Sequence, residues 1–170
     1  MIFVTVGTHE QPFNRLIQEV DRLIETGQIK EIVMMQIGYS TYIPKHSKFV
    51  RFMSFNEIEK AIEESTVVIT HGGPASFLKV LSKGKKPVVV PRQTRYDEHV
   101  NDHQLEFAQQ LVDKKFNIDV VVDISELNEK VQSVGKNKME YTSNTEYFVS
   151  SLINITKNLL DKKNKSNIKG

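Results

Sequence analysis

One histidine, two glycines and one serine stand close together in the segment His71-Gly72-Gly73-Pro74-Ala75-Ser76. The β-branched run of residues 67–70 before it predicts a buried strand, and the apolar spacing of residues 77–81 after it predicts a helix. Glycine lets a backbone approach a ligand closely because it has no Cβ, and proline suits a first helical turn. The free N–H groups and positive dipole end of such a helix favour a phosphate. With the histidine and serine as side-chain donors, this segment predicts a site for an anionic ligand such as a diphosphate.

A second polar segment, residues 91–104, contains two Arg, two His, two Asp, one Glu, one Asn and two Gln. These side chains suit hydrogen bonds to sugar hydroxyls or phosphates, although a simple helix cap in a solvated loop is the alternative. His99 and His103 have i,i+4 spacing, but there is no HExxH pattern to indicate zinc. No DxD motif is present to hold Mg²⁺ with a nucleotide diphosphate. We therefore expect no metal, and we expect helix ends, His71 and Arg92 to neutralise the diphosphate.

A third polar segment, Gly7-Thr8-His9-Glu10-Gln11, follows the first expected strand. It matches neither the GxGxxG pattern of dinucleotide-binding proteins nor a P-loop. Two interpretations remain open. The segment is either a polar turn that begins the first helix, or a loop whose Thr8 and His9 face the ligand.

The elements that must position these loops alternate along the chain. Strands are expected over residues 2–6, 32–37, 49–52, 67–70, 87–91 and 119–122. Helices are expected over residues 13–24, from a capping box at Ser54 and Glu57 through at least residue 62, over 75–82 and over 101–114. This alternation predicts an α/β fold with a Rossmann-like parallel sheet and helices on both faces. Ligands of such sheets lie at the carboxyl ends of the strands, where all three polar loops converge.

Composition limits the possible functions of the protein and the compartment in which it is expected. The net charge of +2 is too close to balance to indicate nucleic acid, and the absence of Cys excludes disulfides. No apolar run approaches the length of a membrane helix, and Met1 leads into a strand without a signal peptide. We therefore expect a cytoplasmic protein.

The chain divides into two predicted parts, a binding domain over residues 1–135 and a linker, amphipathic helix and basic tail over residues 136–170. The helix is indicated by an apolar stripe from Phe148 to Leu159 at helical spacing. It either folds back on its own domain or faces a partner. The lysines of the tail either form a solvated end or make a weak contact with a membrane surface.

Together these residues resemble the sugar-nucleotide-binding half of a GT-B glycosyltransferase. The nearer resemblance is to proteins with a glycosyltransferase-28 C-terminal domain. These include the catalytic subunit of the eukaryotic enzyme that adds the second GlcNAc to dolichol-diphosphate-GlcNAc, and bacterial capsule and exopolysaccharide β-1,4-galactosyltransferase subunits. The resemblance covers residues 1–130 and is carried by Val4-Thr5-Val6-Gly7-Thr8, Thr70-His71-Gly72-Gly73-Pro74, Val90-Pro91-Arg92-Gln93 and Glu98-His99-Val100-Asn101-Asp102-His103-Gln104.

The resemblance implies a role for each matching residue. His71 and the Gly72–Gly73 backbone would hold the diphosphate, and Ser76 would donate to a phosphate oxygen. The donor sugar or its diphosphate would be contacted by Asn101, His103 and Gln104. The crevice facing the acceptor would be lined by Gly7, Thr8 and His9. Lys79 departs from the superfamily's ribose-binding Glu; because Lys has no acceptor, we expect another group such as Glu98 to hold the ribose.

The resemblance also implies an activity. It is that of the donor-binding, catalytic subunit of a two-component inverting glycosyltransferase that uses no cofactor. A hexose, expected to be galactose from UDP-galactose, would move to an undecaprenyl-diphosphate-linked saccharide in capsule or exopolysaccharide synthesis. A membrane-anchored partner would supply the other half and recruit this chain to the inner face of the plasma membrane. His9 is the candidate general base, unless the partner supplies it. The alternatives are a non-catalytic nucleotide-sugar-binding regulatory or stabilising subunit, and a free-standing UDP-sugar epimerase or hydrolase.

Overall fold

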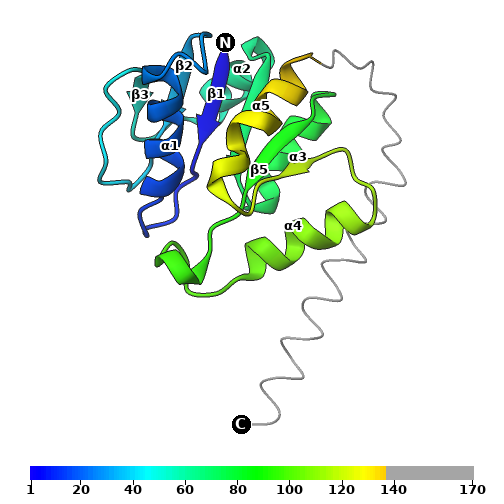
Figure 1. The fold of residues 1–170 in the computed structure, drawn as a ribbon. Coiled ribbons are helices and arrows are strands. Elements are labelled where there is room, and N and C mark those ends of the chain that lie inside the picture. Colours follow the sequence, from blue (N-terminus) through cyan, green and yellow to red (C-terminus); the bar gives the residue numbers. More distant parts are fainter. Residues whose placement is uncertain (137–170) are drawn as a thin grey trace, which may run out of the picture. The chain divides into compact units, whose positions relative to one another are not determined.

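A six-stranded sheet forms the centre of residues 1–136, the part of the chain that the computed structural model describes (Figure 1). All strands are parallel, in the spatial order β3-β2-β1-β4-β5-β6. The strands are β1 (Ile2–Thr5), β2 (Val33–Gln36), β3 (Lys48–Val50), β4 (Val67–His71), β5 (Pro87–Val90) and β6 (Asp119–Val120). The predicted Rossmann-like parallel sheet is confirmed, although most strands are shorter than the apolar runs that indicated them.

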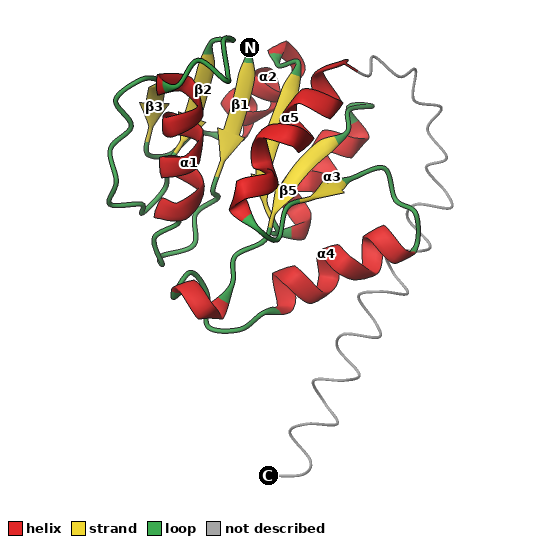
Figure 2. Ribbon diagram, viewed as in Figure 1, coloured by secondary structure: helices red, strands yellow, loops and turns green. Residues whose placement is uncertain are grey.

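Helices cover both faces of this sheet, as Figure 2 shows. They are α1 (Asn14–Glu25), α2 (Phe55–Glu64), α3 (Pro74–Ser82), α4 (His103–Asp113) and α5 (Leu127–Lys136), with short 3-10 turns η1 (Thr94–Tyr96) and η2 (Ile124–Glu126). Side chains of α1 and α5 share one buried apolar cluster with the sheet, and those of α2 and α3 lie in the cluster on the opposite face. Phe77 of α3 and Phe107 of α4, with ring centroids 5.9 Å apart, connect those two helices.

Local sequence signals explain where the first two helices form. Leu16, Ile17 and Val20 are buried along one side of α1, as their spacing predicts. The capping box of α2 is also confirmed. Ser54 Oγ accepts from the Glu57 N–H at 3.4 Å, and the Glu57 carboxylate accepts from the Ser54 N–H at 2.7 Å.

Helix α5 was not predicted. Leu127, Val131 and Val134 are buried in the same apolar cluster as α1, so this helix completes the cover of one sheet face. The linker was predicted to begin at residue 136, but Lys136 is the last residue of α5. The rest of the predicted linker, the predicted helix over 148–159 and the basic tail lie outside the described residues. Within the described residues, no helix is both long and apolar enough to cross a bilayer.

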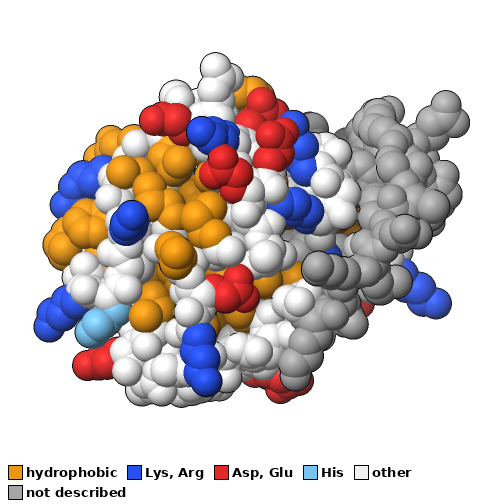
Figure 3. Space-filling view, turned by 90° about the horizontal axis from the view of Figure 1, so that it is seen from above, with side chains coloured by type: hydrophobic (Ala, Val, Ile, Leu, Met, Phe, Trp, Pro, Cys, Tyr) orange, Lys and Arg blue, Asp and Glu red, His pale blue; other side chains and the backbone are white. Residues whose placement is uncertain are grey.

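The two edges of the sheet differ. Figure 3 looks from the side at which β1 begins and shows hydrophobic side chains gathered there between charged ones. The polar loops predicted from the sequence follow β1, β4 and β5, so they lie at the opposite edge, where the strands end. The hydrophobic area of Figure 3 therefore does not belong to the ligand edge.

Candidate functional site at the carboxyl edge of the sheet

Three loops, residues 7–12, 71–76 and 92–104, meet at the carboxyl ends of β1, β4 and β5. β1 and β4 are neighbours in the sheet, with β2 and β3 on one side and β5 and β6 on the other. The chain order reverses at this point, and α/β sheets bind ligands in the crevice that such a reversal opens. The fold thus brings the three predicted loops together at a place suited to a ligand.

The His71 ring fills the space between two glycines. A Cβ on Gly7 would lie 2.5 Å from His71 Cε1 and 2.8 Å from Nε2, and a Cβ on Gly73 would overlap the same ring. Gly7 also has a φ of +73°, which residues with a side chain adopt at a cost. Both glycines are therefore needed to admit the imidazole, in addition to any approach of the backbone to a ligand.

His71 is a neutral side chain at physiological pH. Burial lowers its pKa from 6.5 to about 4, and the positive charge of Arg92 acts in the same direction, while the Thr5 carbonyl opposes them. His71 is therefore uncharged in this structure, and its predicted part in neutralising a diphosphate stays a prediction. A neutral imidazole still donates one hydrogen bond, and its Nε2 lies 3.5 Å from the Ser76 hydroxyl oxygen.

The first turn of α3 offers backbone donors to an anion. Gly73 is the N-cap residue and no side chain caps this helix, which has Pro74 in its first turn. Pro74 has no N–H and the Ser76 N–H donates to the Gly73 carbonyl at 3.0 Å, so the Ala75 N–H and the positive dipole end are the groups open to a phosphate. Gly72 lets this turn pack against the next loop, since a Cβ there would lie 2.9 Å from Gln104 Cβ and 3.0 Å from Pro91 Cα. Gln104 in turn accepts from the Arg92 N–H at 3.3 Å through its side-chain oxygen.

His9 and His99 form a stacked pair. Their ring centroids lie 4.5 Å apart and the planes differ by 16°. His9 Nε2 lies 2.8 Å from the side-chain oxygen of Gln11, and His99 Nδ1 accepts from the Asn101 N–H at 3.3 Å. The pKa of His99 is lowered, first by burial and then by His9 and Arg92. The half-buried His99 ring thus lies against the candidate base.

Arg92 has a different role from the predicted one. Its side chain is fully buried, and its guanidinium donates to the carbonyls of Gln11 at 2.7 Å, Glu98 at 3.0 Å and Val6 at 3.0 Å. It also lies over the Phe13 ring, 4.7 Å from the centroid. Burial lowers its pKa to about 10, so it stays charged. Arg92 joins the β1 loop to the β5 loop through these carbonyls. Because its side chain is fully buried, it cannot contact a diphosphate bound at the surface.

Glu98 is not available to ribose. Its buried carboxylate forms a two-pronged ion pair with Arg15 of α1 at 2.8 and 2.9 Å, and it accepts from the Gln93 N–H at 3.1 Å. Lys79, the residue that departs from the superfamily pattern, places its ammonium 3.1 Å from the centroid of the Phe55 ring. Neither pairing is indicated by the sequence pattern.

The remaining predicted residues lie at the start of α4 or in the β1 loop. Asn101 Oδ1 accepts from the His103 N–H, the first of this helix, at 3.2 Å, while the N-cap residue Asp102 makes no capping hydrogen bond. His103 itself is exposed, with Nδ1 3.6 Å from the Glu106 carboxylate. Thr8 is exposed at the turn after β1. Asn101, His103 and Thr8 thus lie at the same edge as His71, and their predicted ligand contacts remain predictions.

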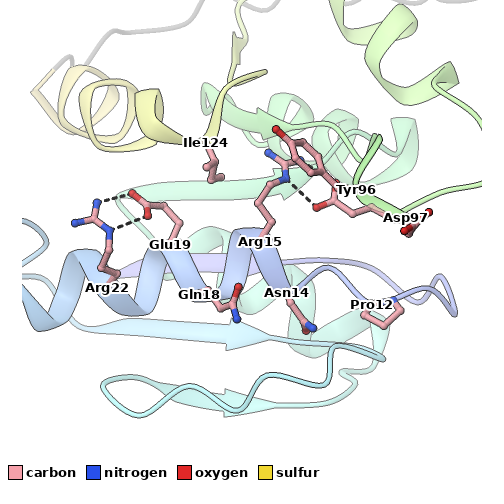
Figure 4. A pocket seen from close by; sticks show the side chains of 10 residues that line it. Pro12, Asn14, Arg15, Gln18, Glu19, Arg22, Tyr96, Asp97 and Ile124 are labelled. Carbon is pink, nitrogen blue, oxygen red and sulfur yellow. Dashed lines mark hydrogen bonds and ion pairs between the residues drawn. The ribbon is translucent and has the colours of Figure 1, made fainter. Parts of the chain in front are cut away.

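A cavity of about 700 Å³ lies beside these loops (Figure 4). It is bordered by α1 and η1, and Arg15 extends across it with its guanidinium 4.6 Å from the centroid of the Tyr96 ring. Among the predicted ligand residues, Glu98 alone lines it within the described part of the chain. The described residues also contain no group of three or more His, Asp or Glu side chains placed to hold a metal ion.

The fold is that of one half of a GT-B glycosyltransferase. MurG of Acinetobacter baumannii superposes on 77% of this chain with a TM-score of 0.53 at 16% identity, and the match covers 40% of MurG. Residues 1–159 match the glycosyltransferase family 28 C-terminal domain, and the chain belongs to that family. This match extends beyond residue 130, where the sequence resemblance was expected to end.

Two curated relatives share part of the chain. The UDP-N-acetylglucosamine transferase subunit ALG13 of Homo sapiens is 33% identical over 119 residues, which is 65% of this chain. The mouse protein of the same name is 31% identical over 119 residues. This chain spans about a tenth of the length of each of these relatives.

Proposed function

We propose that this protein is the donor-binding, catalytic subunit of a two-component inverting glycosyltransferase. Its donor is a UDP-hexose, expected to be UDP-galactose, and its acceptor is a saccharide linked to undecaprenyl diphosphate in capsule or exopolysaccharide synthesis. Family membership supports glycosyl transfer, and the name of the ALG13 relatives supports a UDP-sugar donor and a subunit role. That name makes UDP-N-acetylglucosamine the donor to compare with UDP-galactose.

One observation carries the proposal most directly. The uncapped first turn of α3 opens at the reversal point between β1 and β4, beside the glycines that accommodate His71. A diphosphate bound there would accept from backbone N–H groups, and from the Ser76 hydroxyl and one nitrogen of His71. Because the Arg92 guanidinium is bound to backbone carbonyls, the helix dipole has to provide most of the charge compensation.

The chemistry follows from the position of that turn. The acceptor hydroxyl oxygen forms a bond to the anomeric carbon while the bond from that carbon to the UDP oxygen breaks. The departing electron pair resides on the β-phosphate, which the α3 N-terminus stabilises. The hydroxyl proton passes to His9 as general base. Attack from the face opposite UDP inverts the anomeric configuration.

The proposal needs a second Rossmann-like half for the acceptor. We place it on a membrane-anchored partner that recruits this chain from the cytoplasm to the inner face of the plasma membrane. We also propose that residues 1–135 form the binding domain and residues 136–170 contact the partner. Deletion after Ser143 should then preserve UDP binding and abolish both co-purification with the partner and transfer to lipid. Loss of UDP binding or aggregation would mean that the deleted segment belongs to the binding domain.

Calorimetry and a transfer assay test the function. UDP should bind to the full chain in the presence of a chelator, because no metal takes part in the proposed site. Strict dependence on Mg²⁺ or Mn²⁺ would contradict this. Transfer from UDP-galactose or UDP-N-acetylglucosamine to the lipid-linked acceptor should require both this chain and the partner. Transfer by the partner alone would indicate a regulatory subunit, and UDP-sugar turnover without acceptor would indicate an epimerase or hydrolase.

A further inference from the structure

We propose that Gln11 fixes His9 in one tautomer, with the proton on Nε2 and the lone pair of Nδ1 free to accept a proton. Gln11 and His99 are then positioning residues for the candidate base. The inference rests on the proposed function in one respect only, which is that an acceptor hydroxyl delivers the proton to Nδ1. It specifies which nitrogen of His9 reacts. It also gives a role to Gln11 and His99.

The orientation of the Gln11 amide follows from its other partner. Gln11 Nε2 lies 3.3 Å from the backbone carbonyl of Asp97, which can only accept a hydrogen bond. The NH₂ group of the amide must therefore face Asp97, and its oxygen faces His9. Reversing the amide would place two oxygens against each other at Asp97. The contact between the β1 loop and the β5 loop thus sets which end of the amide His9 meets.

The tautomer of His9 follows from that oxygen. Gln11 Oε1 lies 2.8 Å from His9 Nε2, and an amide oxygen accepts but cannot donate. The hydrogen bond requires a proton on Nε2, so the neutral ring has its lone pair on Nδ1. Within the described residues, no hydrogen bond is made by Nδ1 of His9. This arrangement follows the general logic by which a neighbouring acceptor orients a histidine base.

His99 restrains the ring plane. It stacks on His9 with centroids 4.5 Å apart, and its own tautomer is set because Nδ1 accepts from the Asn101 N–H. Two stacked imidazolium ions would repel each other, and after burial the neighbouring His9 is the next cause that lowers the pKa of His99. Arg92 and His103 add positive charge that acts on His99 in the same direction. A neutral ring is the form that a general base needs before the reaction.

Nuclear magnetic resonance of the full chain, labelled with ¹⁵N at histidine, tests the tautomer without any activity measurement. At about pH 7.5, well above the ordinary histidine pKa, the His9 signals should show a protonated Nε2 and an unprotonated Nδ1. Gln11→Leu should give a mixture of both tautomers. Gln109→Leu, at an exposed position on α4, is the matched control and should leave the signals unchanged. A protonated Nδ1 in the wild type, or no change in Gln11→Leu, would overturn the assignment.

Kinetics with the partner test the positioning role. Gln11→Leu should lower kcat about 10- to 100-fold, because general-base catalysis contributes about that much or more, while KM for the UDP-sugar stays the same. Unchanged kcat in Gln11→Leu with an altered tautomer would show that His9 is not the base. If the wild type binds UDP and shows the tautomer but transfers no sugar, the proposed function fails while the hydrogen-bond assignment stands.

Discussion

The imidazole of His71 occupies the volume that a side chain on Gly7 would need, with Cε1 only 2.5 Å from where a Cβ would lie. This relationship joins the ends of two neighbouring strands, β1 and β4, through one ring. Gly7 is therefore required both for its positive φ and for the space that it leaves to the His71 ring. The two residues must therefore be considered together in any substitution.

Gly7→Ala should destabilise the protein and weaken UDP binding together. The left-handed φ costs about 1–2 kcal/mol for a residue with a Cβ, and displacing the His71 ring adds about 1–3 kcal/mol. Gly84→Ala is a matched control, because its φ of +70° is similar and nothing lies within 4 Å of the added Cβ. Urea unfolding should show a clearly larger loss for Gly7→Ala. Equal losses would mean that the ring moves aside freely.

His71 should make stability depend on pH in the mildly acidic range. Its pKa is about 4 in the folded protein and 6.5 when unfolded, so the unfolded state binds more protons between these values. Its contribution is fully present above pH 6.5 and is lost as the pH falls towards 4. The shift corresponds to about 3 kcal/mol. His71→Gln should flatten the unfolding free energy over this range, whereas an unchanged slope in the variant would exclude His71 as the source.

Replacing Arg92 should unfold or loosen the ligand edge. Arg92→Met leaves the carbonyls of Val6, Gln11 and Glu98 without their donor, and we expect a loss of about 3 kcal/mol or more in unfolding free energy. Arg95→Met is the matched control: Arg95 is exposed, with its guanidinium 4.7 Å from the Tyr96 ring centroid, so its replacement should change stability by about 0.5 kcal/mol or less. Similar effects of the two variants on the urea midpoint would contradict the buried role of Arg92.

His71→Ala should weaken UDP binding far more than His99→Ala. His71 lies beside the first turn of α3, whereas His99 lies on His9. A lost hydrogen bond to an ionised phosphate costs about 1.5–3 kcal/mol, or about ten- to a hundredfold in affinity. His99→Ala should instead lower the rate of transfer. Calorimetry with UDP separates the two, and equal affinity losses would place His99 against the diphosphate.

The sequence predicted the fold and the meeting of the loops because strand periodicity and loop position are local signals. It failed for Arg92 and Glu98, which a one-dimensional pattern cannot distinguish from exposed ligand-binding residues. Their partners are distant in sequence: Arg15 lies 83 residues from Glu98, and the Gln11 carbonyl lies 81 residues from Arg92. Helix α5 could have been predicted, because Leu127, Val131 and Val134 have helical spacing. The pairing of Gln11 with His9 was not, because it depends on the Asp97 carbonyl 86 residues away.

The buried Arg92 has a consequence for how fast a ligand associates. Since its guanidinium binds carbonyls of the β1 loop and the β5 loop at once, we expect the two loops to move together. A nucleotide should then meet loops that are already in place, so that no slow closure precedes tight binding. In stopped-flow mixing the observed rate should rise linearly with UDP concentration and show no plateau. Arg92 would thereby make association a single bimolecular step, although it does not contact the ligand.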